Sequence, residues 1–183
     1  MRLFLALDLP ADARAAIGLW RDTLVGAHDD LRPVPDEALH VTLVFLGRRP
    51  CELVDRVWES AARAIEGLAA PILAPVTLKA VPPRRPRVLA LDLEDRNAAA
   101  ASAQRSLSAS LRTAGLHEAE ARPFWPHVTV ARARGRARVR ELEAMTPLDA
   151  PFTATHVTLY RSDLHPDGAR YVALERMELR GLD

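Results

Sequence analysis

Residues 39–47 of this 183-residue chain read LHVTLVFLG, and this segment gives the clearest indication of both fold and chemistry. It contains the tetrad HVTL at residues 40–43, and a similar tetrad, HVTV, follows 87 residues later at residues 127–130. Side chains alternate between the two faces of a β-strand. Each tetrad therefore predicts a strand that presents a histidine and a threonine on one face and apolar residues on the other.

The two tetrads together suit acid–base chemistry on a phosphodiester. If both strands face one cleft, His40 and His127 can act as general base and general acid, because imidazole changes its charge near neutral pH. Thr42 and Thr129 can donate hydrogen bonds to the non-bridging phosphate oxygens, where negative charge builds up. This chemistry needs no metal ion, and we expect no cofactor.

A third tetrad limits what spacing alone can establish. Residues 156–159 repeat HVTL letter for letter, so that three copies compete for two places in a catalytic pair. A single His-x-Thr in a strand also occurs at surfaces and in cores without any chemistry. The residues by themselves therefore leave open which two histidines form the pair.

The remaining pattern predicts an α+β chain with two loosely similar halves that divide near residue 95. No linker separates these halves, so we expect residues 1–183 to form a single bilobal domain with pseudo-symmetric halves. The periodicity predicts strands over 3–9, 40–47, 72–80, 87–93, 124–133, 152–160 and 170–179, a loop over 27–38, and helices over 11–25, 52–68, 96–114 (ending at Gly115) and 139–145.

Composition excludes some classes of protein. The chain carries 25 Lys and Arg against 24 Asp and Glu, a net charge of +1, which excludes a uniformly basic, histone-like nucleic-acid binder. Lys79 is its one lysine, and eight arginines fall in two short segments, 84–87 and 132–140. These segments are interpreted either as a track for an RNA backbone or as solvated loops of an arginine-rich chain.

A single cysteine, Cys51, excludes an intramolecular disulfide and a multi-cysteine zinc site. Its position after Pro50 indicates a residue at a helix start rather than a nucleophile. The short apolar stretch at the N-terminus does not match a signal peptide, and no apolar run reaches the length of a membrane span. We therefore expect a cytoplasmic protein with no membrane partner.

The two tetrads and their flanks resemble the signature segments of the 2H phosphoesterase superfamily, and within it the RNA 2′,3′-cyclic phosphodiesterase (2′-5′ RNA ligase) family. The segments that carry the resemblance are 39–47 and 122–132, together with 2–7, 84–89 and 159–162 in the same order. The resemblance implies a bilobal α+β fold, with two antiparallel-sheet lobes, outer helices and a central active-site cleft. In this family His156 occupies a variable position, so that His40 and His127 form the implied pair.

The implied reaction opens RNA 2′,3′-cyclic phosphate ends to 2′-phosphates without a metal, and includes reversible 2′-5′ RNA ligation. The resemblance places Thr42 and Thr129 on the phosphate. We expect His40 to act as the acid toward the departing 3′ oxygen and His127 to act as the base on water. Arg132 follows the second tetrad and would contact phosphate or a base. In an unbroken strand it points away from His127, so this role requires a bend or a β-bulge.

Two alternatives stay open: a phosphodiesterase of small cyclic nucleotides, and an RNA-end-binding or ligase-like accessory protein. The expected partner is RNA with cyclic phosphate ends, tRNA fragments among them, and the expected state is a monomer. Trp125 stands where relatives often have a basic residue, and residues 32–34 stand where the loop before His40 often carries a tryptophan in relatives. Phe124 and Trp125 could stack on a base, but only one of them can share the face of His127.

Overall fold

The structure is a computed structural model that describes residues 1–26, 28–118, 120, 122–134, 148–165 and 168–181. Three α-helices, two short 3-10 turns and the strands of one sheet make up this part of the chain. In chain order these are β1 (Arg2–Asp8), α1 (Ala11–Val25), β2 (Leu31–Pro33), η1 (Asp36–Ala38), β3 (His40–Arg48), η2 (Cys51–Leu53), α2 (Val54–Ile65), β4 (Ile72–Val81), β5 (Val88–Asp95), α3 (Ala99–Thr113), β6 (His127–Ala133), β7 (Phe152–Thr153), β8 (His156–His165) and β9 (Gly168–Glu178).

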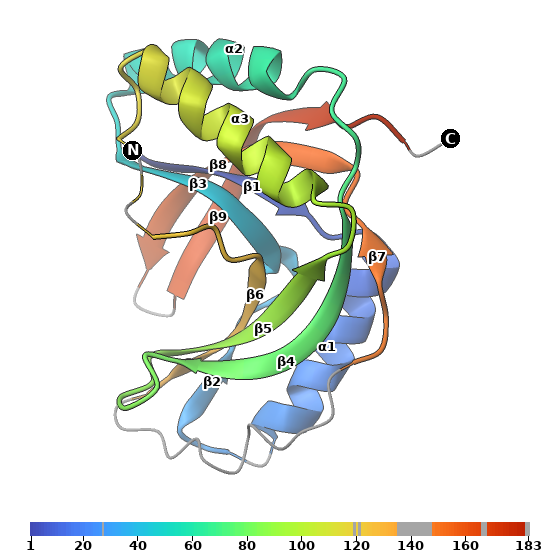
Figure 1. Cartoon of the computed structure of the whole chain (residues 1–183). Coiled ribbons are helices and arrows are strands. Elements are labelled where there is room, and N and C mark those ends of the chain that lie inside the picture. The colour runs from blue at the N-terminus through green and yellow to red at the C-terminus, as the bar shows by residue number, and fades with distance from the viewer. Residues whose placement is uncertain (27, 119, 121, 135–147, 166–167, 182–183) are drawn as a thin grey trace.

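The sheet has two halves that meet at one point. Its strand order is β7-β4-β5-β6-β3-β1-β8-β9, and β2 pairs with the far end of β6. All of these strand pairings are antiparallel, and the two halves join where Val41 of β3 pairs with Val128 of β6. Figure 1 shows the strands of the two halves curving apart from this junction. The tetrads therefore lie at the point where the halves meet.

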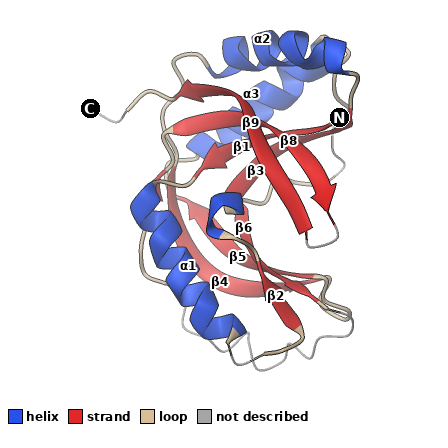
Figure 2. Ribbon diagram, turned by 180° about the vertical axis from the view of Figure 1, so that it is seen from behind, coloured by secondary structure: helices blue, strands red, loops and turns tan. Residues whose placement is uncertain are grey.

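Helices cover the outside of both halves. α2 and α3 pack on each other, and α3 packs on β3 and β5, so this pair covers one end of the sheet (Figure 1). α1 packs on β2 and β6 and lies over the half that contains β4 and β5, on the side that faces the viewer in Figure 2. This arrangement confirms the expected α+β class with two antiparallel halves and outer helices.

The arrangement of the sheet and helices determines which side chains are buried. Every residue of β1 from Leu3 to Asp8 is buried, so both faces of this strand are covered, and β1 also pairs with β3 and β8 on its two edges. In α3 the buried residues Ala103, Leu107 and Leu111 recur every four positions, the spacing of one helix face. The helix ends at Thr113, and Gly115 follows with φ +69°. This left-handed conformation is the one that favours glycine just beyond a helix end, where the sequence predicts it.

The structure corrects several expected boundaries. Within 27–38, predicted as a loop, β2 forms because its backbone pairs with β6. The strand predicted over 124–133 starts only at His127, since Pro123 and Pro126 cannot donate ladder hydrogen bonds. The helix predicted over 52–68 ends at Ile65, shortly before Gly67, which has φ +71°. The helix predicted over 139–145 lies outside the described residues.

The two halves of the sheet do not correspond to consecutive halves of the chain. β1 and β3 pair with each other and β1 also pairs with β8, whereas β4 and β6 both pair with β5. The pseudo-symmetry of sequence halves dividing near residue 95 stays a prediction. Among the described residues, no helix combines the length and apolar character needed to cross a membrane.

Candidate active site

A cleft of about 620 Å³ opens at the junction of the two sheet halves and brings together all five predicted site residues. His40 and Thr42 come from β3, and His127, Thr129 and Arg132 come from β6. The antiparallel pair Val41–Val128 places the two histidines on diagonally opposed positions. In a regular ladder such diagonal neighbours lie about 7–8 Å apart, and both histidines line the same cleft.

The β3 tetrad follows the predicted alternation and then departs from it. Val41 is buried, whereas His40 and Thr42 reach the cleft. The register with β1 shifts beyond Thr42, and both Leu43 and Val44 are buried. This bulge returns the next residue, Phe45, to the cleft face.

The β6 tetrad has a bulge at the equivalent position, and it explains how Arg132 reaches the site. The register with β5 pairs Leu89 with Ala131 but Ala90 with Thr129, so that Val130 is the extra residue. Val130 and Ala131 are both buried, and Arg132 therefore returns to the face of His127 and lines the cleft. The bulge that the role of Arg132 requires is present.

Both imidazoles are held in the same way. The Nδ1–H of His40 donates to the carbonyl oxygen of Ala38, and that of His127 to the carbonyl oxygen of Trp125, both at 2.8 Å. A backbone carbonyl only accepts, so Nδ1 carries the proton in each ring and Nε2 is the atom left for chemistry. In His40, Nε2 accepts a hydrogen bond from the Thr42 hydroxyl at 3.0 Å.

Aromatic rings surround His40 on the side away from β6. The ring centroid of Phe4 lies 4.9 Å from that of His40, and the ring of Tyr171 meets His40 edge-on at 5.1 Å. Burial lowers the pKa of His40 to about 4, because the imidazolium loses its hydration there. Composition and spacing did not indicate Phe4 or Tyr171, which come from the first and last strands of the chain.

A buried carboxylate lies beside these rings. Asp8 accepts hydrogen bonds from the hydroxyls of Thr158 and Tyr160, each at 2.9 Å, and pairs with Arg176 at 2.9 Å. Burial, together with the Asp8 charge, raises the pKa of Tyr160 to about 12, so its hydroxyl stays a donor. Asp8 is also the cross-strand neighbour of His40 in the ladder between β1 and β3.

Trp125 supports the second histidine. Its indole stacks on the His127 ring, with centroids 4.1 Å apart and planes 18° from parallel. The indole N–H donates to Asp92, and Asp92 in turn pairs with Lys79, whose ammonium lies 5.4 Å from the indole centroid. Phe124 instead packs against the core. Of these two aromatic residues, Trp125 is thus the one beside His127.

Other expected residues lie away from the cleft. His156 is not among the described residues that line it, and its Nδ1 forms a hydrogen bond with the neighbouring Thr155 hydroxyl at 2.8 Å. Cys51 is exposed at the start of η2 and does not line the cleft either. Within the described part of the chain, no group of three or more His, Cys, Asp or Glu side chains could hold a metal ion.

The two arginine-rich segments lie next to each other at the far end of β6. The backbone N–H of Ala133 donates to the carbonyl oxygen of Arg87 at 2.9 Å. Of their described arginines, only Arg132 lines the cleft. Arg136, Arg138 and Arg140 lie outside the described residues.

Three comparisons relate this chain to known proteins. The family described as the 2′-5′ RNA ligase superfamily matches residues 9–166. The RNA 2′,3′-cyclic phosphodiesterase of Thermus thermophilus is 35% identical, over 99% of this chain and 91% of that relative. A crystal structure of a Thermus thermophilus protein has a TM-score of 0.84 at 30% identity and covers 99% of both chains. Escherichia coli LigT complexed with 3′-AMP has a TM-score of 0.80 at 28% identity and covers 97% of both chains.

Proposed function

This chain belongs to the 2′-5′ RNA ligase superfamily, and we propose that it uses His40 and His127 as paired acid–base catalysts to hydrolyse RNA 2′,3′-cyclic phosphate ends to 2′-phosphomonoesters. The chain is an RNA 2′,3′-cyclic phosphodiesterase. The pairing of the histidines, the independence from metal ions and the reversal of the reaction are the parts that we propose.

One observation carries the proposal. Two His-x-Thr strands from different halves of the sheet line one cleft, and each imidazole is fixed through Nδ1 to a carbonyl two residues earlier. Fixing Nδ1 in both rings leaves two Nε2 atoms to exchange protons with a substrate between them. A structural histidine would not require the same carbonyl anchor on both strands.

The protonation state of His40 favours its role as the base. Burial is the main cause that lowers its pKa to about 4, and the charges of His127 and Arg132 act in the same direction. The hydrogen bond to the Ala38 carbonyl and the charge of Asp8 oppose this lowering. At pH 7 His40 is then neutral in the free protein, so its Nε2 can accept a proton but has none to donate. In the free protein this favours His40 as the base and His127 as the acid, the reverse of the direction expected from the sequence.

A water oxygen attacks phosphorus, and its proton passes to Nε2 of His40. The bond between phosphorus and the 3′ oxygen breaks, and Nε2 of protonated His127 gives its proton to that oxygen, which leaves a 2′-phosphate and a 3′-hydroxyl. On substrate binding the Thr42 hydroxyl turns from Nε2 of His40 to a non-bridging oxygen, Thr129 donates to the other, and Arg132 balances their charge, so no metal ion is required. With an RNA 5′-hydroxyl in place of water, the same groups would form a 2′-5′ bond.

The test is the conversion of an oligoribonucleotide with a 2′,3′-cyclic phosphate end into its 2′-phosphate, in the presence of EDTA. His40→Ala and His127→Ala should each lower kcat/KM by about 10²–10⁴-fold, the usual contribution of one general acid or base. His156→Ala, which removes a histidine outside the cleft, serves as the matched control. Undiminished conversion by either cleft variant, or loss of activity with EDTA, would contradict the mechanism.

The same measurements distinguish the proposed function from the two alternative functions. Higher kcat/KM on 2′,3′-cyclic mononucleotides than on cyclic-ended RNA would favour small cyclic nucleotides as substrates. Tight, salt-dependent binding of cyclic-ended RNA with negligible turnover would favour an RNA-end-binding protein. tRNA fragments as substrates, the monomeric state and the cytoplasmic location stay predictions.

A further inference from the structure

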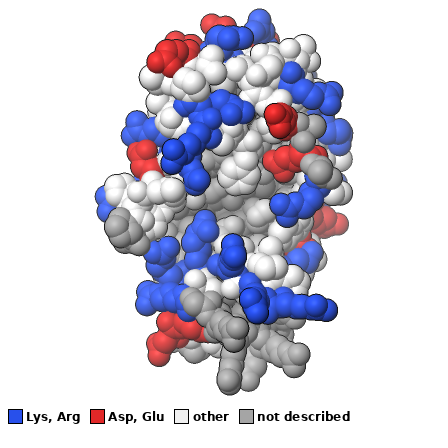
Figure 3. All heavy atoms as spheres, turned by 90° about the vertical axis from the view of Figure 1, so that its left-hand side faces the viewer, with Lys and Arg blue, Asp and Glu red and all other residues white. Residues whose placement is uncertain are grey.

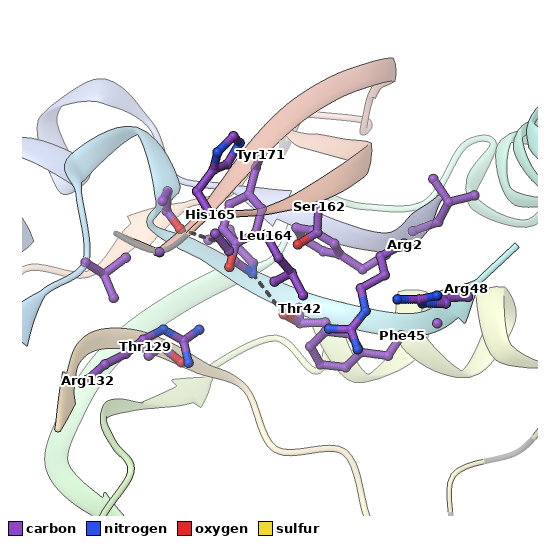
Figure 4. A pocket seen from close by; sticks show the side chains of 18 of the residues that line it. Arg2, Thr42, Phe45, Arg48, Thr129, Arg132, Ser162, Leu164, His165 and Tyr171 are labelled. Atoms are coloured by element: carbon purple, nitrogen blue, oxygen red, sulfur yellow. Dashed lines mark hydrogen bonds between the residues drawn. The ribbon is translucent and has the colours of Figure 1, made fainter. Parts of the chain in front are cut away.

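We infer that Arg2 and Arg48 form a second phosphate site, which holds a backbone phosphate of the RNA strand that ends in the reacting cyclic phosphate. This inference rests on the proposed function and extends it from the terminal phosphate to the strand behind it. Both arginines line the same cleft as the catalytic histidines. Figure 4 shows them at one end of this pocket with Phe45, whereas Thr129 and Arg132 lie at the other end.

The two arginines belong to a row of donors across three neighbouring strands. Arg2 of β1 lies opposite Arg48 of β3 on one side and opposite Ser162 of β8 on the other, and all three residues line the cleft. Directly opposed residues of antiparallel strands have Cβ atoms about 4.5–5.5 Å apart. Two guanidinium groups and a hydroxyl at this spacing can converge on the oxygens of one phosphate.

The charges in this row lack a counterpart in the described chain. Like charges directly opposite each other in a sheet are destabilising, yet neither guanidinium forms an ion pair or a hydrogen bond with another described residue. By contrast Arg161, next to Ser162, pairs with Asp163. Figure 3 shows Lys and Arg side chains on either side of a hollow in this face. A bound anion would relieve the repulsion between Arg2 and Arg48.

An exposed aromatic ring separates this row from the catalytic pair. The bulge in β3 turns Phe45 into the cleft, where it is 61% exposed, and its ring lies 6.0 Å from that of Phe4. Phe4 in turn lies against His40. Along β1, Arg2 stands two residues beyond Phe4, a distance of about 7 Å in a strand. The His40 imidazole, the Phe45 ring and the two guanidinium groups therefore lie in the order in which they would contact the cyclic phosphate, a base and the next phosphate of one RNA strand. Bases of single-stranded RNA commonly stack on aromatic side chains.

The reaction indicates which strand occupies this row. Hydrolysis needs only water as its second reactant, so a phosphate site beside the catalytic pair serves the strand that carries the cyclic end. The favoured substrate is accordingly a single-stranded oligoribonucleotide with at least one phosphodiester besides the cyclic phosphate. A cyclic mononucleotide fills the catalytic site but leaves the row of Arg2 and Arg48 without a ligand.

The test compares two substrates in the full-length protein: adenosine 2′,3′-cyclic phosphate, and a tetranucleotide with the same cyclic end. The ratio of kcat/KM for the tetranucleotide to that for the mononucleotide should fall about tenfold in Arg2→Gln/Arg48→Gln, the order of loss expected for charge-assisted hydrogen bonds to phosphate. The Arg2→Lys/Arg48→Lys variant keeps the charge and should recover most of the ratio. The salt dependence of tetranucleotide binding should weaken by about 0.7 in log–log slope for each phosphate that the variant no longer neutralises.

Arg105→Gln/Arg112→Gln removes the same charge at exposed residues of α3 that do not line the cleft, and it should keep the wild-type ratio. A ratio unchanged in Arg2→Gln/Arg48→Gln, or lowered equally in the Arg105 and Arg112 variant, would overturn the inference. Fluorescence anisotropy with a labelled tetranucleotide that ends in a plain 3′-hydroxyl measures the site without turnover. Absence of turnover would refute the proposed function, whereas equal affinity of wild type and Arg2→Gln/Arg48→Gln would refute the second phosphate site alone.

Discussion

Replacing His40 by asparagine should make the stability of the protein much less sensitive to acidification from pH 6.5 to pH 4. Burial lowers the pKa of His40 from 6.5 to about 4, so between these values the unfolded chain binds a proton that the folded protein excludes. The contribution of His40 to the free energy of unfolding is therefore fully present above pH 6.5. It is lost as the pH falls toward 4, and it does not change further below that.

The size of this effect follows from the two pKa values. At 1.36 kcal/mol per pKa unit, the difference between 6.5 and about 4 corresponds to at most about 3 kcal/mol. The ring lines the cleft and keeps some contact with water, which makes this figure an upper value. A loss of this size is a substantial fraction of the about 5–15 kcal/mol that stabilises a typical domain.

Urea unfolding at pH values from 7.5 to 3.5 measures the effect, in a buffer without phosphate because an anion in the cleft would favour protonated His40. The free energy of unfolding of the wild type should fall more steeply below pH 6.5 than that of His40→Asn, and the difference in slope should vanish as pH 4 is approached. His156→Asn controls for the loss of a histidine outside the cleft. Parallel curves for the wild type and His40→Asn would refute the argument from burial.

Three further substitutions test other parts of the structure. Asp8→Ala leaves the buried Thr158 hydroxyl without its acceptor and should lower the free energy of unfolding by about 3 kcal/mol in urea, more than Asp8→Asn does; equal losses would count against the network. Trp125→Leu removes the stacked ring from His127 and should lower kcat on a cyclic mononucleotide up to about tenfold, with little change in KM. Leu107→Ala should destabilise the protein by about 2–5 kcal/mol without altering KM, because Leu107 lies on the buried face of α3 and does not line the cleft.

Much of the site could be predicted because strand periodicity is a local property. Alternation in each tetrad places His40 with Thr42, and His127 with Thr129, on one face, and the structure agrees. The third tetrad has the same local pattern, yet His156 lies at the start of β8, away from the cleft. Nothing within four residues distinguishes it, because the difference lies in which strands become neighbours.

Whether residues beyond the tetrads reach the site depends on how strands distant in the sequence pair with each other. In a regular strand Arg132 would point away from the cleft, and the bulge at Val130 turns it toward the cleft. This bulge is a shift in the register between β6 and β5. Phe45 reaches the cleft through the equivalent irregularity of β3 against β1. Asp92 and Lys79, which hold Trp125, come from β5 and β4, and no sequence spacing links them to His127.

The sequence alone thus indicated the local chemistry: three strands that each present a histidine and a threonine opposite apolar residues, in an α+β pattern with little net charge. The tertiary structure decided the rest, namely which two tetrads meet, which residues the bulges turn inward, and that burial lowers the pKa of His40. The physical reason is the distance along the chain over which each property is determined. Backbone periodicity depends on neighbours along the chain, whereas register shifts, burial and electrostatic interactions depend on strands that pair across the sheet.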